Sequence, residues 1–140
     1  MACQFPRPTA PSRHGSTIRV ESRRGTCDGV LSRGGFVLGE LDSHGPLCTE
    51  AAAALGILVI AVDYRLTPEQ HFPAAPDDCE AAARWLAGSP AALGRTATGL
   101  IACGDSAGGN LAIALALALP QFPQSYTVIA TGSEGMFCVT

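Results

Sequence analysis

Hydrophobic residues gather in this chain into short runs separated by turns that contain glycine and proline. The runs Ile57 to Val62 and Gly99 to Cys103 are nearly continuous apolar stretches, which is typical of strands buried on both faces of a parallel sheet. The run Leu111 to Leu119 alternates large and small residues, and the strong helix propensity of Ala and Leu predicts a helix there. A helix that is apolar all round must be covered on both sides.

Two further helices are predicted from the residues at their ends. One lies between Pro46, which suits a first helical turn, and Gly56, which suits a helix end. The other opens at Pro76 and ends at Gly88, with acidic residues in its first turns. Between the two helices lies a predicted strand, so strands and helices alternate along the chain.

This alternation predicts the fold class. Strands that alternate with helices form right-handed βαβ units, and therefore an α/β fold with a mostly parallel sheet and helices on both faces. The carboxyl ends of parallel strands gather at one edge of the sheet. Gly34-Gly35, Asp63 and Ser106 are expected to converge at that edge.

The first part of the chain differs from the rest in its composition and in its pattern of hydrophobic residues. Residues 1–33 contain several prolines and six of the nine basic residues, and only Thr17 to Glu21 alternates like a strand. We expect residues 1–33 to form a poorly structured N-terminal leader and residues 34–140 to form the folded domain. An Arg- and Ser-rich organelle transit peptide is the alternative for the leader, because no acid precedes Glu21.

Composition narrows the class of protein. A chain of 140 residues with 47% hydrophobic and 15% charged residues is typical of one globular domain. Its net charge of -3 gives no reason to expect nucleic acid as a partner. The longest apolar stretches fall short of the roughly 20 residues of a transmembrane segment, and the N-terminus lacks the apolar core of a secretory signal. A cytoplasmic location is therefore expected.

The six cysteines are dispersed along the chain. None forms a C-x-x-C pair, and no His lies near them at the spacing of a zinc site. Free thiols in a reducing compartment are the expected state. The sequence predicts neither a metal nor a cofactor, and it has no G-x-G-x-x-G after a strand and no Gly-Lys-Ser/Thr to hold a phosphate.

The candidate chemistry lies in the stretch Gly104 to Asn110, GDSAGGN. Gly104 and Gly108 flank Ser106 at the G-x-S-x-G spacing, where a side chain would clash as the strand and helix backbones approach each other. The start of the following helix supplies unpaired backbone N–H groups and a positive dipole end next to the hydroxyl. Ser106 is therefore the candidate nucleophile.

Three sequence blocks occur in order and at sensible spacing. They are Gly34 to Gly39 (GGFVLG), Asp63 to Glu69 (DYRLTPE) with Phe72 to Ala75 (FPAA), and Gly104 to Asn110. Together these blocks resemble the hormone-sensitive-lipase group of α/β-hydrolases, which includes many carboxylesterases. The resemblance runs from Gly34 to Leu119 and implies a partial α/β-hydrolase fold that lacks the C-terminal strands.

The resemblance implies a serine carboxylic-ester hydrolase that acts on small-molecule esters. Ser106 is then the nucleophile that forms an acyl-enzyme. The backbone N–H groups of Gly34, Gly35 and Ala107 form the oxyanion hole, which stabilises the negative charge that develops on the ester oxygen. The block Asp63 to Glu69 is implied to brace the active-site edge.

The chain departs from the family at its oxyanion loop. The family has His-Gly-Gly-Gly where this chain has Ser32-Arg33-Gly34-Gly35, so Arg33 replaces the first glycine. A strand is expected just before this loop, but Gly25 to Leu31 is poor in β-branched residues.

A second departure follows Ser106. The fold orders its triad as Ser, then Asp or Glu, then His, but residues 107–140 contain no Asp and no His. Glu134 is the sole acid there, and His14, His44 and His71 all precede the serine. The resemblance therefore implies a partial, C-terminally truncated member of the family, whose missing elements would leave exposed apolar surface that favours self-association. The alternative hypothesis is a catalytically incompetent hydrolase remnant or interaction module, since no Asp or His follows the serine.

Overall fold

The computed structural model describes part of the chain. The described residues are 2–4, 17–22, 28–32, 36, 45–89, 91, 94, 99–104, 106–119 and 125–126.

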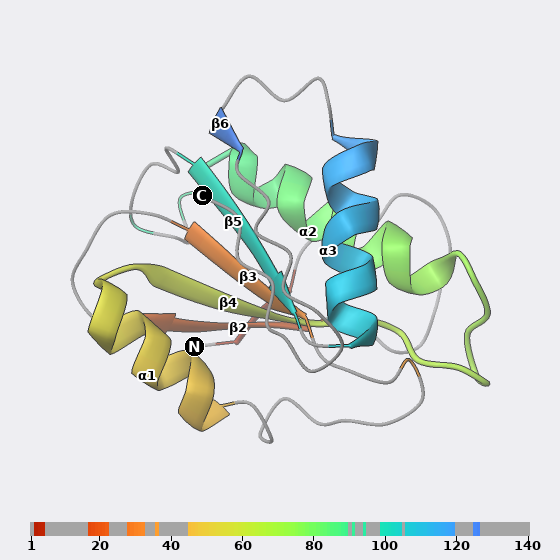
Figure 1. The fold of residues 1–140 in the computed structure, drawn as a ribbon, viewed down its shortest axis with the longest axis horizontal. Helices are drawn as coiled ribbons and strands as arrows, with labels where there is room; N and C mark the ends of the chain where they lie inside the picture. Colours follow the sequence, from red (N-terminus) through yellow and green to blue (C-terminus); the bar gives the residue numbers. More distant parts are fainter. Residues whose placement is uncertain are drawn as a thin grey trace.

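The described strands form one six-stranded sheet with the strand order β1-β2-β4-β3-β5-β6 (Figure 1). Strands β3, β4, β5 and β6 are mutually parallel, whereas β2 is antiparallel to β4 and to β1. The predicted mostly parallel sheet is confirmed. The strand bounds are β1 Ala2–Gln4, β2 Thr17–Ser22, β3 Asp28–Ser32, β4 Leu58–Asp63, β5 Gly99–Gly104 and β6 Ser125–Tyr126.

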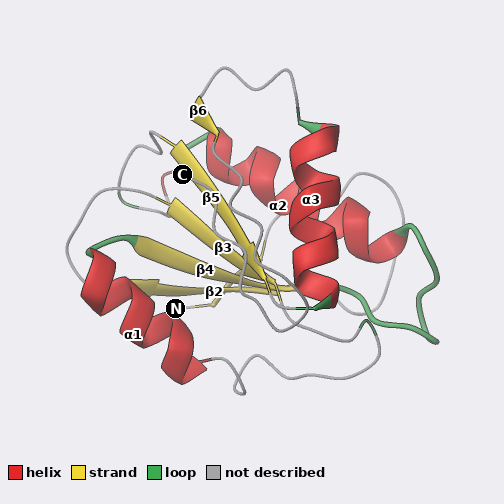
Figure 2. Cartoon of the chain, in the orientation of Figure 1, coloured by secondary structure: helices red, strands yellow, loops and turns green. Residues whose placement is uncertain are grey.

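Helices cover both faces of this sheet, with α1 on one side of the strands and α2 and α3 on the other (Figure 2). The helix bounds are α1 Gly45–Leu55, α2 Ala74–Ala87 and α3 Ala107–Ala118. The first two helices were predicted from their end residues, and the third from its Ala and Leu content. The expected arrangement of helices on both faces is therefore confirmed.

The alternation of side chains along β4 builds a hydrophobic core on each face, because successive residues of a strand point to opposite sides. The larger core joins Leu58, Ile60 and Val62 to buried residues of α2 and α3, among them Leu86 and Leu111. The smaller core joins Val59 and Ala61 to Cys48 and Ala52 of α1. Since β4 is buried on both faces, it needs a continuous apolar sequence, which is the pattern that predicted it.

Strands β2 and β3 correct the expectation for residues 1–33. β3 lies between β4 and β5 and pairs in parallel with both, and β2 pairs with the other edge of β4. The expectation of a poorly structured leader is wrong for these two segments, and the sheet extends across the predicted boundary at residue 33. The physical reason is that β3 sits between two strong strands, and this tertiary context overrides its poor β propensity.

The helix α3 presents apolar side chains on two sides. Leu111, Leu115 and Leu119 are buried against the sheet and α2. Ile113 is 40% exposed and Leu117 is 76% exposed. The expected exposed apolar surface on this helix is thus confirmed, while self-association through it stays a prediction.

Among the helices that the structure describes, none has both the length and the apolar character of a membrane span.

Candidate active site

Ser106 stands at the turn between the last residue of β5, Gly104, and the first residue of α3, Ala107. Its backbone dihedral angles are φ 50° and ψ -110°. These values lie outside the regions that are favourable for an L-amino acid. Such a conformation costs of order 1–3 kcal/mol and persists only where the surrounding structure imposes it.

The Ser106 hydroxyl is not used to cap its own helix. A serine at the N-cap position usually accepts a hydrogen bond from a backbone N–H of the first turn, but Ser106 makes no such side-chain bond. Ser106 is also exposed. The Ser106 side chain is therefore accessible to solvent and makes no hydrogen bond with the first turn of α3.

Ala107 is buried and begins α3 directly after the serine. The backbone N–H of Asn110 donates to the Ser106 carbonyl at 3.2 Å, which closes the first turn of the helix. The N–H groups that come earlier in a helix have no intrahelical acceptor. The Ala107 N–H is such a group, and it follows the Ser106 hydroxyl by one residue.

Gly104 lets β5 and α3 approach each other closely. A Cβ added to Gly104 would lie 2.5 Å from the carbonyl carbon of Gly108 and 2.6 Å from its oxygen. No side chain fits at such distances, because core packing already fills the space to van der Waals contact. The predicted clash at Gly104 is confirmed, and its partner is the backbone of Gly108.

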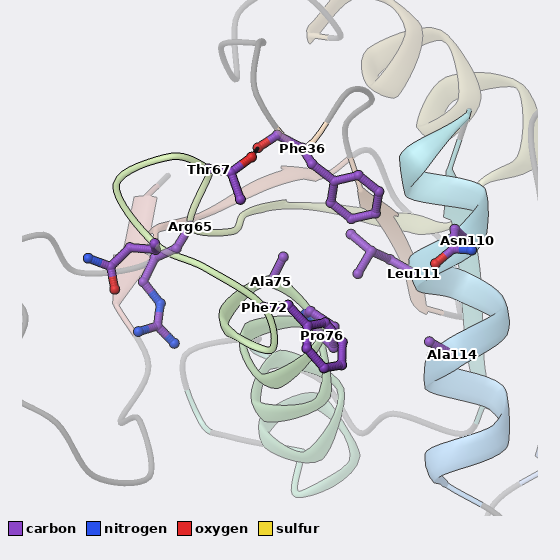
Figure 3. A pocket seen from close by; sticks show the side chains of 10 residues that line it. Phe36, Arg65, Thr67, Phe72, Ala75, Pro76, Asn110, Leu111 and Ala114 are labelled. Atoms are coloured by element: carbon purple, nitrogen blue, oxygen red, sulfur yellow. Dashed lines mark hydrogen bonds between the residues drawn. The ribbon is translucent and has the colours of Figure 1, made fainter.

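The loop after β4 is bonded to the segment that carries the predicted oxyanion donors. Both the backbone N–H and the Oγ1 of Thr67 donate to the Phe36 carbonyl, at 2.8 Å and 3.1 Å (Figure 3). Phe36 has a positive φ of 48° and follows Gly35 directly. These two bonds hold the loop after β4 to Phe36, while the bracing of the active-site edge that the family resemblance implies stays a prediction.

The same loop is fixed to α2 by a largely buried ion pair. The Nε and Nη2 atoms of Arg65 each lie 2.9 Å from an oxygen of Asp78, and the Arg65 backbone N–H donates to the same carboxylate at 3.0 Å. Asp78 is 1% exposed. A bidentate pair of this kind fixes direction as well as distance, so Arg65 and Asp78 set the path of the chain between β4 and α2.

A pocket of about 390 Å³ opens between this loop, the start of α2 and the first two turns of α3 (Figure 3). Its walls are mostly apolar side chains, with a few polar ones. Ser106 is not among the described residues that line it, whereas Asn110, one helical turn further along α3, is. The lining residues are Phe36, Arg65, Thr67, Gln70, Phe72, Ala75, Pro76, Asn110, Leu111 and Ala114.

The structure brings together some of the predicted site residues. Ser106 and Ala107 are adjacent at the elbow, while Gly34 and Gly35 lie outside the described residues, so their role in an oxyanion hole stays a prediction. β3 and β5 end side by side, with Ser32 opposite Gly104, so the end of β3 lies at the edge of the sheet that carries the elbow.

A hydrogen-bonded general base for the serine is not found within the described part of the chain. No hydrogen bond from the Ser106 hydroxyl is present there, and His71 is an exposed residue of the loop before α2. The positions of His14, His44 and Glu134 fall outside the description. The described residues also hold no cluster of His, Cys, Asp or Glu that could bind a metal ion.

The pocket residues and the partner of Arg65 were not predicted from the sequence. Asn110 and Ala114 follow Ser106 at intervals of four, a spacing that places them on successive turns of one helix side. Asp78 was interpreted as a first-turn acid that favours the helix dipole, although it lies on the apolar side of α2. A charged residue among the apolar positions of a helix indicates a buried ion pair, and the position of Asp78 could have been interpreted in this way.

Comparison with known proteins agrees with this geometry. A family model described as alpha/beta hydrolase fold matches residues 33–131. The chain belongs to the α/β hydrolase fold family. An ethyl acetate hydrolase of Pseudomonas putida is 51% identical over 86 residues, which are 61% of this chain and 27% of that protein.

Two further relatives support the resemblance to esterases and hormone-sensitive lipase. Human hormone-sensitive lipase is 43% identical over 84 residues, which are 60% of this chain and 8% of the lipase. The solved structure of a hyperthermophilic esterase from the archaeon Pyrobaculum calidifontis superposes with a TM-score of 0.75 at 35% identity, over 89% of this chain and 40% of that one. The residues matched in the ethyl acetate hydrolase are 27% of that protein, so this chain spans about a quarter of its length.

The close approach at the elbow predicts the effect of a single methyl group. We expect Gly104→Ala to lower the free energy of unfolding by about 3 kcal/mol or more, because its Cβ meets backbone that cannot move aside. Gly88→Ala is the matched control, since Gly88 has an ordinary φ of -70° and its Cβ would lie 3.3 Å from a carbonyl oxygen. We expect the control to change stability by less than about 1 kcal/mol. Urea unfolding measures both, and equal effects would contradict the close contact.

The backbone conformation of Ser106 predicts that glycine at this position stabilises the fold. A positive φ costs glycine nothing, so we expect Ser106→Gly to be more stable than Ser106→Ala by about 1 kcal/mol after the greater flexibility of unfolded glycine is included. Neither variant has a hydroxyl, so the comparison isolates the backbone. Urea unfolding of the two variants gives the difference, and a less stable glycine variant would contradict a strained residue 106.

The buried ion pair predicts a contrast between two acids on the same helix. We expect Asp78→Ala to destabilise the protein by about 3 kcal/mol, because it leaves the Arg65 guanidinium and backbone N–H without their acceptor. Glu80, whose carboxylate lies 2.6 Å from the Arg84 Nη2, forms an exposed i, i+4 pair. We expect Glu80→Ala to cost less than about 1 kcal/mol. Thermal or urea unfolding of the two variants measures both costs. If Glu80→Ala destabilises the protein as much as Asp78→Ala, the prediction is wrong.

Proposed function

We propose that this chain carries the nucleophile of a serine carboxylic-ester hydrolase that acts on small-molecule esters. The observation that carries the proposal is the backbone of Ser106, held at φ 50° and ψ -110° with an exposed hydroxyl that caps nothing. A fold that keeps such a costly conformation at a serine gains no stability from it, and strain of this kind clusters at functional sites. The relatives named esterase and ethyl acetate hydrolase support the same substrate class.

In the proposed reaction the Ser106 oxygen attacks the ester carbonyl carbon and its proton passes to a base. The tetrahedral intermediate then expels the alcohol, which takes up a proton, and leaves an acyl group bonded to Ser106. Water attacks this acyl-enzyme, releases the carboxylic acid and restores the hydroxyl. In this second half-reaction the base takes a proton from the attacking water and returns it to the Ser106 oxygen, so the two half-reactions together restore the starting protonation state of the enzyme.

The negative charge of each intermediate needs fixed hydrogen-bond donors. The Ala107 N–H stands next to the nucleophile at the start of α3, and we propose it as one donor, with Gly34 and Gly35 as the others. Donors fixed in advance need no reorganisation as the charge develops, and the loss of one such donor typically costs about 100- to 1000-fold in rate.

A second candidate function is favoured by the residues after Ser106. Positions 107–140 contain no Asp and no His, so no base of the usual triad order is present in them. Without a base the hydroxyl stays protonated, and oxyanion donors and binding alone leave a rate roughly 1000- to 10,000-fold above that in water. The second candidate is therefore a catalytically incompetent hydrolase remnant or interaction module.

A phosphonylation experiment separates the two candidates. Purified chain is incubated with a fluorophosphonate and, in parallel, with a short-chain p-nitrophenyl ester. We expect phosphonylation at Ser106, located by peptide mass spectrometry, and ester turnover that both disappear in Ser106→Ala. Absence of both in a sample whose cooperative unfolding shows that it is folded would exclude the hydrolase and leave the interaction module.

The pH dependence of the labelling rate identifies the base. Under the second candidate function, in which no general base acts, the rate rises about tenfold per pH unit from pH 6 to 9, because the reactive species is the small deprotonated fraction of the serine. A histidine base instead gives a plateau above about pH 7, where the imidazole is neutral. A plateau would assign the base role to one of the chain's three histidines and contradict labelling without a base.

A further inference from the structure

Phe36 is held by the loop after β4 through both its backbone and its ring. Its carbonyl oxygen accepts the backbone N–H of Thr67 at 2.8 Å and the Thr67 Oγ1 at 3.1 Å (Figure 3). Its ring lies against the ring of Tyr64, with 6.5 Å between the ring centroids and 58° between the ring planes. Aromatic pairs favour separations and tilts of this size. Because Tyr64 is buried, the ring of Phe36 is docked on the hydrophobic core.

The loop that holds Phe36 is itself fixed to α2. Arg65 donates three hydrogen bonds to the Asp78 carboxylate, from Nε and Nη2 at 2.9 Å each and from its backbone N–H at 3.0 Å. Charge-assisted bonds of this bidentate kind fix direction as well as distance. Thr67 follows Arg65 by two residues. A continuous series of contacts therefore runs from α2 through this loop to Phe36.

Phe36 has a backbone conformation that phenylalanine disfavours. Its φ is 48°, and a positive φ is a genuine outlier for a bulky side chain. Such a conformation persists only where the surrounding structure imposes it, and the contacts with Thr67 and Tyr64 supply such a constraint. Only φ and ψ of Phe36 relate the plane of its carbonyl group to the plane of the preceding peptide group. Holding the carbonyl and the ring therefore also restricts the peptide group between Gly35 and Phe36.

The connection between Phe36 and the elbow edge of the sheet is short. Ser32, the last residue of β3, is paired with Gly104, which lies two residues before the serine of the elbow. Only residues 33–35 join Ser32 to Phe36. This three-residue segment begins after a residue held by the sheet and ends before a residue held by Thr67, so a change at Thr67 acts on one of its two attachment points.

We infer that Thr67 is a positioning residue for the oxyanion donors, because its Oγ1 holds Phe36 in the conformation that directs the preceding glycines toward the Ser106 oxygen. The inference rests on the proposed function, in which Gly34 and Gly35 are two of the donors. A donor acts only when it lies within about 2.7–3.1 Å of the oxyanion. Loss of the Oγ1 bond therefore lowers the stabilisation of the transition state and leaves ground-state binding unchanged.

The kinetic test is saturable labelling of Ser106 by the fluorophosphonate, which gives a maximum rate, kinact, and a half-saturating concentration. In this reaction the Ser106 oxygen attacks phosphorus, fluoride leaves, the serine proton passes to a base or to solvent, and negative charge develops on the phosphoryl oxygen. We expect Thr67→Val, which keeps the shape and loses the hydroxyl, to lower kinact about fivefold, the factor of one neutral hydrogen bond. The half-saturating concentration is expected to stay unchanged. Thr67→Ser, which keeps the oxygen, is expected to restore kinact.

Amide hydrogen exchange at residue 67 tests the contact itself without using the reactivity of the serine. The N–H of residue 67 donates to the Phe36 carbonyl, so its protection from exchange, followed by NMR, reports how often this contact opens. We expect this protection to fall about fivefold in Thr67→Val and to be retained in Thr67→Ser. The matched control is Thr49→Val, the same change at an exposed position of α1, which is expected to alter neither kinact nor this protection.

Three outcomes would overturn the inference: undiminished protection at residue 67 in Thr67→Val, an unchanged kinact in a variant whose protection has fallen, or a lowered kinact that Thr67→Ser does not restore. If Thr67→Val loses cooperative unfolding, Thr67→Ala removes the same oxygen and is expected to show the same losses. A wild-type chain that is not labelled, but whose residue-67 protection falls in Thr67→Val, would exclude the proposed hydrolase chemistry. The positioning role would be excluded with it, and only the link between Thr67 and Phe36 would remain.

Discussion

The close contact between the backbones of Gly104 and Gly108 is the constraint on which the site depends. With a Cβ at residue 104 only 2.5 Å from Gly108, the strand and the helix could not meet at this angle. Because they do meet, the connection between them is very short, and Ser106 is forced into a conformation that serine does not favour. The same short connection keeps the hydroxyl exposed and places the Ala107 N–H beside it. The exposure of Ser106, the strain of its backbone and the position of the Ala107 N–H thus all occur at this one packing contact.

The opposite wall of the site depends on a different interaction. The loop after β4 belongs to neither a helix nor a strand, and the Arg65–Asp78 pair ties it to α2. Two residues further on, Thr67 transfers this order to Phe36 through two bonds to one carbonyl. Phe36 is thus linked to α2 through a buried charge. A misplaced buried charge is strongly unfavourable, so this pair also disfavours alternative paths of the loop.

The elements that could be predicted from the sequence are those whose burial produces a recognisable pattern within the element itself. β4 and β5 were visible because both of their faces are covered, and α1, α2 and α3 because their ends or their compositions are distinctive. β3 was not visible, since its place between β4 and β5 is a property of its partners. The elbow was predictable for the same reason as β4, because its glycines, serine and helix start are contiguous. The pocket was not, because it assembles Phe36, Phe72 and Ala114 from three segments that only the fold brings together.

Family membership can be recognised from features that lie close together in the sequence, whereas activity depends on residues that are distant in the sequence. The elbow, the Ala107 N–H proposed as an oxyanion donor and the direction of α3 all depend on β5 and the first turns of α3, which are contiguous in sequence, so a chain can retain them with little else of an enzyme. A general base reaches the serine only through the fold, from residues remote in sequence. An elbow is therefore strong evidence of descent from a serine hydrolase. Catalysis requires in addition a proton acceptor within hydrogen-bond reach of the Ser106 oxygen. If such an acceptor is present, the strained conformation of Ser106 serves a reaction. If it is absent, the strain is only a feature of the packing between β5 and α3.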